Sequence, residues 1–192
     1  LPAGVIDSVV APLFSSDLPD MRKKEIREAL RGNALEPTLR EQNVPEAIAT
    51  AMRRAYCELE LPKNADIKTY GDEDIIMKLP TKNILVTSGY RKFQQSKIHI
   101  LGIEKLFAYI VIDSNDDPKN WKGKERIFSD ILEMERWSPE EVLALGDNPK
   151  SELGAAKALG ICAVQVLRPS IQKWDGADHH INSLNELAAL IK

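Results

Sequence analysis

Cysteine and histidine are scarce in this sequence, and neither is spaced for a metal site or a disulfide framework. The two cysteines among the 192 residues, Cys57 and Cys162, lie in separate segments and match no metal-binding spacing. Both are expected to be small buried apolar residues. The three histidines form no triad or metal-binding spacing. Low cysteine content is typical of a reducing compartment, and we predict a cytoplasmic protein.

The sequence also lacks a long hydrophobic run and an excess of one charge. No apolar segment approaches the roughly 18 residues that a membrane span needs, and no signal-peptide pattern is present at the start. The formal net charge is -3, and no basic stripe is visible. We therefore expect neither a membrane nor a nucleic acid as partner. The oligomeric state is left open.

What is present suits a globular α/β protein, with 43% hydrophobic and 29% charged residues. In the first part of the chain the apolar residues repeat at helical spacing. The expected helices are 4–14, 17–32 and 45–55. A polar connector follows over residues 62–71. We predict a small all-helical domain at 15–75, while 1–14 and 76–192 form an α/β core.

From residue 83 onward, short continuous apolar runs alternate with helical segments. These runs are 83–87, 107–112, 142–145 and 162–167. Such runs predict strands of a parallel sheet whose two faces are both covered by helices. Capping boxes at Ser138 and Ser183 predict the starts of two of the helices. The expected fold class is α/β, with a doubly wound, Rossmann-like parallel sheet.

Polar residues follow the first of these runs, at the sheet edge where open parallel sheets bind ligands. Thr87, Ser88 and Gly89 combine hydroxyl groups with free backbone N–H groups in a tight turn, and such a turn can cradle a phosphoryl group. A turn of this composition also simply ends many strands.

The third run is followed by two acids, Asp147 and Glu152. Their oxygen atoms suit a hard cation such as Mg²⁺, although Asp147 alone could instead cap the next helix. Between the two strand ends lie Lys122 and Lys124. A lysine at this edge could neutralise carboxylates and a phosphoryl oxygen, and the alternative is a solvated surface charge.

In this chain order the three groups closely resemble the second, third and fourth motifs of the haloacid dehalogenase superfamily. The resemblance implies that Thr87, with Ser88 beside it, binds the phosphoryl group. It implies that Lys122 steadies the nucleophile and the transferring group. It also implies that Asp147 and Glu152 hold Mg²⁺.

The resemblance covers residues 83–192, and the helical domain takes the place where many members insert a cap. Lys122 is chosen over Lys124, its close rival, because of its spacing to Ile127 and Phe128.

The first motif of the superfamily, an apolar strand followed by Asp-x-Asp, has no match here. The nearest candidate is Asp7, but Val9 stands where the second aspartate belongs, and the spacing there is helical. In the superfamily this strand lies between the strands that end at Thr87 and Leu145. Leaving it out would unpair buried backbone groups, at about 1–3 kcal/mol each. We therefore expect a further strand with the Asp pair, on roughly 10–20 residues ahead of Leu1.

The resemblance implies a Mg²⁺-dependent phosphatase that cleaves a small phosphate monoester through an aspartyl-phosphate. Thr87 and Lys122 are the expected catalytic residues. Dehalogenase or phosphomutase chemistry and an inactive binding protein are alternatives, as is a receiver domain. The acids after Gly146 favour a metal, which dehalogenation does not need, and the helical domain argues against a receiver.

Overall fold

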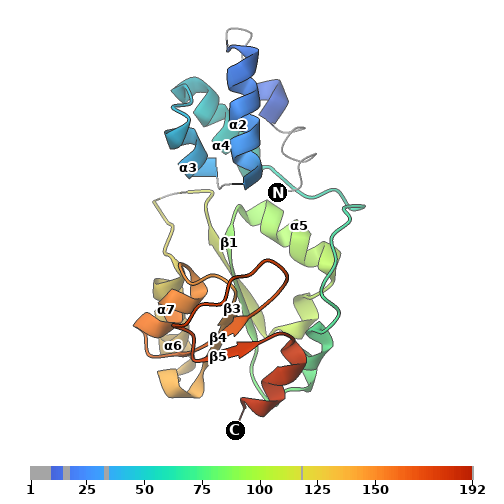
Figure 1. Ribbon diagram of the computed structural model, residues 1–192, viewed down its shortest axis with the longest axis vertical. Coiled ribbons are helices and arrows are strands. Elements are labelled where there is room, and N and C mark those ends of the chain that lie inside the picture. Colours follow the sequence, from blue (N-terminus) through green and yellow to red (C-terminus); the bar gives the residue numbers. More distant parts are fainter. Residues whose placement is uncertain (1–9, 15–17, 33–34, 118, 192) are drawn as a thin grey trace.

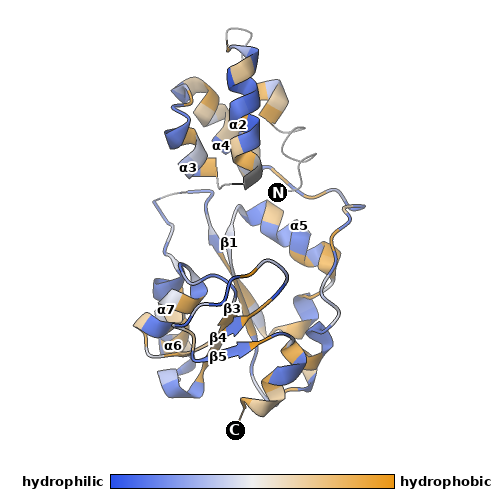
Figure 2. Cartoon of the chain, in the orientation of Figure 1, coloured by the Kyte–Doolittle hydropathy of each residue, from blue (hydrophilic) through white to orange (hydrophobic). Residues whose placement is uncertain are grey.

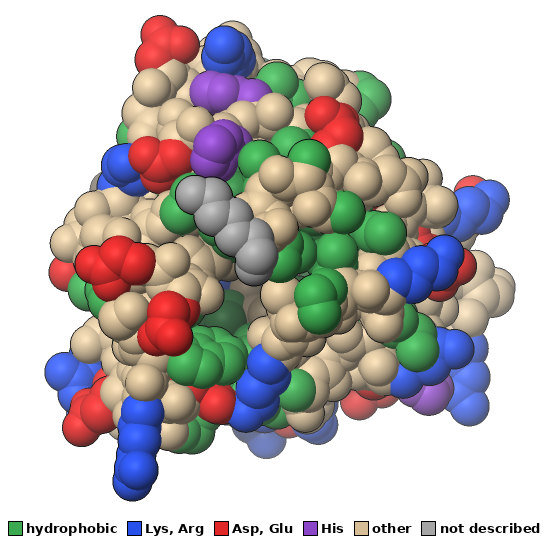
Figure 3. Space-filling model, turned by 90° about the horizontal axis from the view of Figure 1, so that it is seen from below, with side chains coloured by type: hydrophobic (Ala, Val, Ile, Leu, Met, Phe, Trp, Pro, Cys, Tyr) green, Lys and Arg blue, Asp and Glu red, His purple; other side chains and the backbone are tan. Residues whose placement is uncertain are grey.

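The computed structural model describes residues 10–14, 18–32, 35–117 and 119–191. Helices form a bundle at one end, and parallel strands with flanking helices form the other (Figure 1). The face turned away from the bundle carries hydrophobic side chains near its centre, with acidic and basic side chains mixed around them (Figure 3). In these ranges no helix combines the length and the apolar character that crossing a bilayer requires.

The bundle is built from three helices and one short 3₁₀ turn. They are η1 (Ala11–Leu13), α2 (Asp20–Gly32), α3 (Leu35–Glu41) and α4 (Glu46–Cys57). Their apolar faces meet in one core, while α2 is hydrophilic over most of the side seen in Figure 2. Val10 is fully buried in this core. Residues 10–14 therefore pack with the bundle, although the sequence placed them with the sheet.

The helices of the bundle agree with the sequence only in part. α2 and α4 correspond to expected helices, whereas α3 was not predicted. Pro37 lies in the first turn of α3, where its missing N–H has no intrahelical partner to lose. Residues 4–9 of the first expected helix, and Asp7 with them, lie outside the described residues.

The second part of the chain is an α/β fold in which every described strand pairing is parallel. Its strands are β1 (Ile84–Gly89), β2 (Tyr109–Ser114), β3 (Leu143–Gly146), β4 (Cys162–Val166) and β5 (His179–Ile181). Its helices are α5 (Arg91–Leu101), α6 (Lys124–Glu135) and α7 (Glu152–Ala158), with 3₁₀ segments η2 (Glu73–Lys78), η3 (Glu104–Leu106), η4 (Pro139–Glu141) and η5 (Leu184–Ala189). The predicted fold class and the four predicted strands are confirmed. Both predicted capping boxes form, but each begins a 3₁₀ segment rather than an α-helix.

The described strands form two sheets, not one. β1 pairs with β2 in the first sheet, and the order in the second is β3-β4-β5. β1 and β3 therefore each keep one edge that no described strand covers. All six residues of β1 are only half-buried, whereas four of the five in β4 are buried. The apolar run of β1 is thus incompletely covered. The interruption between the two sheets, called the break below, separates β1 from β3, the two strands between which a further strand was expected.

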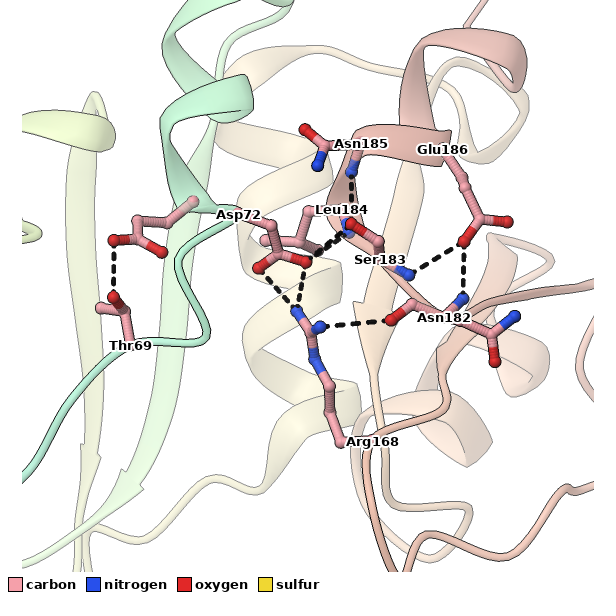
Figure 4. Close-up of polar contacts among 9 residues, drawn as sticks. Thr69, Asp72, Arg168, Asn182, Ser183, Leu184, Asn185 and Glu186 are labelled. Atoms are coloured by element: carbon pink, nitrogen blue, oxygen red, sulfur yellow. Dashed lines mark hydrogen bonds and ion pairs between the residues drawn. The ribbon is translucent and has the colours of Figure 1, made fainter.

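A buried ion pair fixes the end of the connector to the second sheet (Figure 4). Both carboxylate oxygens of Asp72 lie 2.8 Å from Nη2 of Arg168, which follows β4. After β5, the Ser183 hydroxyl and the Leu184 amide donate to Asp72 at 2.9 Å. Burial works to raise the pKa of this carboxyl, but the three donors outweigh it and the pKa is lowered. The chain entering the α/β part is therefore anchored by charge as well as by packing.

The bundle meets the α/β part beside the turn that follows β1. The ring of Tyr56, in α4, lies 5.3 Å from the ring of Tyr90 in an edge-to-face contact. The Leu61 amide donates to the Ser96 hydroxyl of α5 at 2.9 Å. Tyr90 directly follows Gly89, so the bundle contacts the residue next to the end of β1.

Replacing Tyr56 with phenylalanine is expected to stabilise the protein. The side chain is 4% exposed, and its hydroxyl has no hydrogen-bond partner among the described residues. Phe keeps the contact with Tyr90 and removes the unpaired group, so the free energy of unfolding should rise by about 1 kcal/mol in urea denaturation. Tyr70→Phe is the control, because Tyr70 is 67% exposed. A less stable Tyr56→Phe variant would show that the hydroxyl has a partner.

Candidate active site

The tight turn predicted at Thr87, Ser88 and Gly89 is instead the end of β1, which pairs with β2. Residues 87–90, where the chain leaves the strand, are called the Thr87 turn, and a glutamine from the first turn of α5 holds them. The Thr87 hydroxyl donates to Oε1 of Gln94 at 3.2 Å, and Nε2 of Gln94 donates to the Ser88 carbonyl at 2.9 Å. The Ser88 hydroxyl contacts the Asp113 carboxylate at 3.5 Å. Gly89 has a φ of +140°, and a Cβ there would lie 2.6 Å from Nε2 of Gln94. Only glycine therefore suits this position.

Asp113 is the penultimate residue of β2, and it orders the segment that leads into α6. It is 4% exposed and accepts hydrogen bonds from the amides of Lys122 and Gly123, both at 3.1 Å. Gly123 has a φ of +78° and is the N-cap of α6. This backbone turn separates the directions of the two neighbouring lysines.

Lys122, which the spacing favoured as the site lysine, points away from the strand ends. Its ammonium group pairs with Asp130 of α6 at 2.7 Å, and its side chain is 56% exposed. The expected contact with a phosphoryl group at the sheet edge does not fit this direction. The contact with Asp130 is that of a surface charge.

Lys124 takes the direction that was expected of Lys122. It is the first residue of α6, and its Nζ donates to the carbonyl of Val86 in β1 at 2.7 Å. Burial lowers the pKa of Lys124, and the negative charges of Glu152 and Asp113 work in the opposite direction. The Lys124 ammonium group therefore contacts β1 and also interacts electrostatically with Glu152, the acid that begins the helix after β3.

The acid pair lies where β3 leads into α7, with Asp147 in the loop and Glu152 as the first residue of the helix. Oε1 of Glu152 accepts hydrogen bonds from the amides of Asp147 and Asn148, both at 2.9 Å. A Cβ at Gly146 would lie 2.1 Å from Cγ of Glu152, so the glycine makes room for this approach. The loop amides are thus capped by Glu152, and Asp147 does not have the capping role considered as its alternative.

The carboxylates of Asp147 and Glu152 are suitable ligands for a divalent cation, but two carboxylates are too few to complete its coordination shell. Partial burial raises the pKa of Asp147, and the charge of Glu152 raises it further. A cation would relieve this repulsion, and oxygen ligands are those that Mg²⁺ prefers. Over the described ranges, however, no three or more His, Cys, Asp or Glu side chains are grouped to hold a metal ion. Asp147 and Glu152 could supply only part of a ligand shell.

A buried glutamine supports the loop of the acid pair from β4. Gln165 is fully buried, and its Nε2 donates to the carbonyls of Asp147 at 3.4 Å and Gln172 at 2.9 Å. Its Oε1 accepts from the Trp174 amide at 2.8 Å. With donor and acceptor both satisfied, this amide fixes the loop after β3 against the loop after β4.

A cavity of about 490 Å³ lies between β2 and α6, beside the Thr87 turn. Its wall includes Asp113, Lys122 and Ile127, but not Thr87 or Asp147. It therefore adjoins the candidate site without covering the acid pair.

The structure brings together most of the predicted residues and adds two that sequence reasoning missed. Thr87, Lys124 and the Asp147–Glu152 pair lie around the strand ends, whereas the Lys122 ammonium group pairs with Asp130 of α6. Asp113 could have been noticed as an acid at the end of an apolar run. Gln94 carried no signal, because its role depends on the return of α5 over the turn.

Comparison with known proteins agrees with this arrangement. A family model described as a haloacid dehalogenase-like hydrolase matches residues 73–160. The match covers a little under half of the chain, and this segment therefore resembles such hydrolases. The matched segment contains the Thr87 turn, both lysines and the acid pair. No curated protein sequence is similar enough to this chain to count as a relative.

Solved structures share the fold at low sequence identity. A HAD phosphatase from Thermococcus onnurineus is 21% identical, with a TM-score of 0.60 over 98% of this chain and 86% of that one. A putative HAD-hydrolase from Bacillus subtilis, bound to magnesium, is 14% identical, with a TM-score of 0.59 over 100% and 93%. A 2-haloacid dehalogenase from Pseudomonas syringae is 18% identical, with a TM-score of 0.53 over 98% and 90%. Phosphatases and dehalogenases thus both share this architecture.

Proposed function

We propose that this hydrolase is a Mg²⁺-dependent phosphatase that cleaves a small phosphate monoester. The observation that carries the proposal is the position of Lys124. Its ammonium group donates to the Val86 carbonyl next to Thr87, and it interacts electrostatically with Glu152. Phosphoryl transfer needs several kinds of group around the phosphoryl group. These are a cationic donor, a hydroxyl-bearing turn and carboxylates, and all three are present here.

Each described residue has a distinct role in this proposal. The Thr87 hydroxyl and the amides of the turn bind phosphoryl oxygens, and Lys124, in place of Lys122, offsets their developing charge. Asp147 and Glu152 would hold Mg²⁺ together with an acid from the segment that supplies the nucleophile. Bound Mg²⁺ would reduce the repulsion between the anionic nucleophile and the phosphoryl oxygens.

The nucleophile is proposed to be an aspartate on a strand that pairs between β1 and β3. Its carboxylate oxygen forms a bond to phosphorus while the bond from phosphorus to the ester oxygen breaks, and the alcohol leaves with a proton from a neighbouring acid. Water then attacks phosphorus, which releases inorganic phosphate and regenerates the carboxylate. The helical bundle acts as a cap that excludes water and selects the organic part of the substrate.

Dehalogenase chemistry is the second candidate, and the acid pair is the observation against it. Displacement of a halide needs no cation, so two adjacent carboxylates after β3 would have no role in it. A panel of phosphate monoesters and 2-haloacids, assayed with and without Mg²⁺ on protein that carries the nucleophile strand, separates the two reactions. Phosphate release that requires Mg²⁺ supports the proposal. Halide release, or isomerised sugar phosphates without phosphate release, would replace it.

Removing the Asp147 carboxylate is expected to abolish the response of the protein to Mg²⁺. Millimolar Mg²⁺ should raise the thermal unfolding midpoint of the wild type, because a ligand that binds only the folded state stabilises it. Asp147→Asn should lose this shift, since the remaining acid, Glu152, is already bonded to two amides. Asp74→Asn is the matched control, because Asp74 is exposed and distant in sequence. An undiminished shift in Asp147→Asn would remove Asp147 from the metal site.

A further inference from the structure

Gln94 lies beside the proposed phosphate-binding residues, but the proposed reaction gives it no role. It lies in the first turn of α5, and its amide reaches back over the carboxyl end of β1, where the Thr87 turn begins. There it bonds both the Thr87 hydroxyl and the Ser88 carbonyl, at 3.2 and 2.9 Å. Gly89 leaves the space through which it approaches. One side chain therefore contacts three consecutive residues of the proposed phosphate-binding turn.

The orientation of the Gln94 amide follows from its partners. The Ser88 carbonyl can only accept a hydrogen bond, so Nε2 must face it and Oε1 must face Thr87. The Thr87 hydroxyl then donates its proton to Oε1, which holds the side chain in one rotamer. If the amide were flipped, two acceptors would face each other at the Ser88 carbonyl.

The Ser88 carbonyl has no partner among the described strands on its side of β1. The carbonyls of Asn83 and Gly89 accept from the β2 side, from the amides of Ala108 at 2.8 Å and Asn115 at 3.1 Å. Because alternate residues of a strand face alternate neighbours, the Ser88 carbonyl points to the opposite edge. Gln94 therefore supplies a donor where no described strand does, and it fixes the last peptide before Gly89.

We propose that Gln94 is a positioning residue for phosphate binding. It holds the Thr87 hydroxyl and the amides of the turn in the geometry that receives a phosphoryl group, without contacting that group itself. The inference rests on the proposed function, because the turn must bind phosphate for its geometry to matter. Small displacements of such donors weaken their interaction with a bound anion strongly.

The test compares three variants of the full chain, with inorganic phosphate and Mg²⁺ as the probe. Gln94→Met keeps the size of the side chain and loses both hydrogen bonds. Gln94→Glu keeps the acceptor for Thr87, loses the donor to Ser88 and adds a negative charge. Gln95→Met is the matched control, because the neighbouring glutamine is exposed. Phosphate affinity is measured by ³¹P NMR titration, and folding by thermal unfolding.

Gln94→Met is expected to weaken phosphate binding about tenfold, which corresponds to the loss of roughly one hydrogen bond. Gln94→Glu should bind at least as weakly, and Gln95→Met should match the wild type. If Gln94 acts through Thr87, adding Gln94→Met to Thr87→Val should cost little more. A purely structural role would instead lower the unfolding midpoint and leave the two effects additive.

The outcomes separate this inference from the proposed function. If the wild type binds phosphate and both Gln94 variants bind it equally well, Gln94 has no positioning role and the proposed function stands. If the wild type itself does not bind phosphate, the turn is not a phosphate site and both proposals fall. If Gln94→Met does not fold, phosphate binding by Gln94→Glu that equals the wild type's would still overturn the inference.

Discussion

A short apolar strand ending in Asp-x-Asp, added as a peptide, is expected to raise the thermal unfolding midpoint of this protein by about 5–10 °C. A ligand present at 100 times its dissociation constant stabilises the folded state by about 2.7 kcal/mol. In a domain of this size, each kcal/mol shifts the midpoint by about 2–4 °C. The expected binding site is the break between β1 and β3, where both strands keep an edge that no described strand covers.

Two features of β1 make the break a strand-binding site. Ile84, Leu85 and Val86 are apolar but only half-buried, so a further strand would remove apolar surface from water. The Val86 carbonyl is bonded by the ammonium of Lys124 rather than by a strand amide. Pairing of a strand would satisfy this carbonyl and release Lys124 toward the carboxylates that the strand brings.

Control peptides separate architecture from chemistry. A peptide with proline at its centre lacks a backbone donor and should give a much smaller shift. A peptide with Asn-x-Asn in place of Asp-x-Asp should stabilise the protein as well as the original does, but it should support no phosphate release. If the Asp-x-Asp peptide gave no shift at all, the break would not be a strand site, and the nucleophile would have to come from elsewhere.

The strands and the acid pair could be predicted because their signals are local. Four continuous apolar runs indicate buried strands wherever they occur, and β1 to β4 form from them. The spacing of Asp147 and Glu152 after an apolar run places one acid directly after the strand and the other at the start of the next helix. The helix α3 was missed because its seven residues include a proline and carry too little periodicity to stand out.

The sequence could not predict the direction in which a side chain points. That direction distinguishes Lys124 from Lys122 as the site lysine. Spacing to Ile127 and Phe128 favoured Lys122, but the positive φ of Gly123 turns the backbone between the two lysines. Lys124 then opens the helix and faces β1, while Lys122 lies outside it. No count along the sequence shows this, because the turn depends on how Asp113 binds the amides before α6.

Replacing Lys124 with methionine is expected to lower the rate of phosphate release by about 100-fold or more. Loss of one preorganised charged or polar donor to a developing anion has an effect of this order. Lys122→Met is the matched control, since it makes the same change two residues away on a side chain that pairs with Asp130. The variants are compared by kcat and KM for an aryl phosphate in protein supplied with the Asp-x-Asp strand, with thermal unfolding as the check on folding.

The pH dependence gives the role of Lys124 a second, independent measurement. Burial lowers its pKa, and the reaction needs the charged form, so activity should be lost as the pH rises through this lowered value. The loss should therefore begin at a lower pH than an ordinary lysine would cause. In Lys124→Arg the alkaline limb should disappear, because arginine stays protonated throughout this range.

An inactive Lys122→Met beside an active Lys124→Met would restore the assignment made from spacing, and it would mean that the Lys124–Val86 contact only fills the break between the sheets.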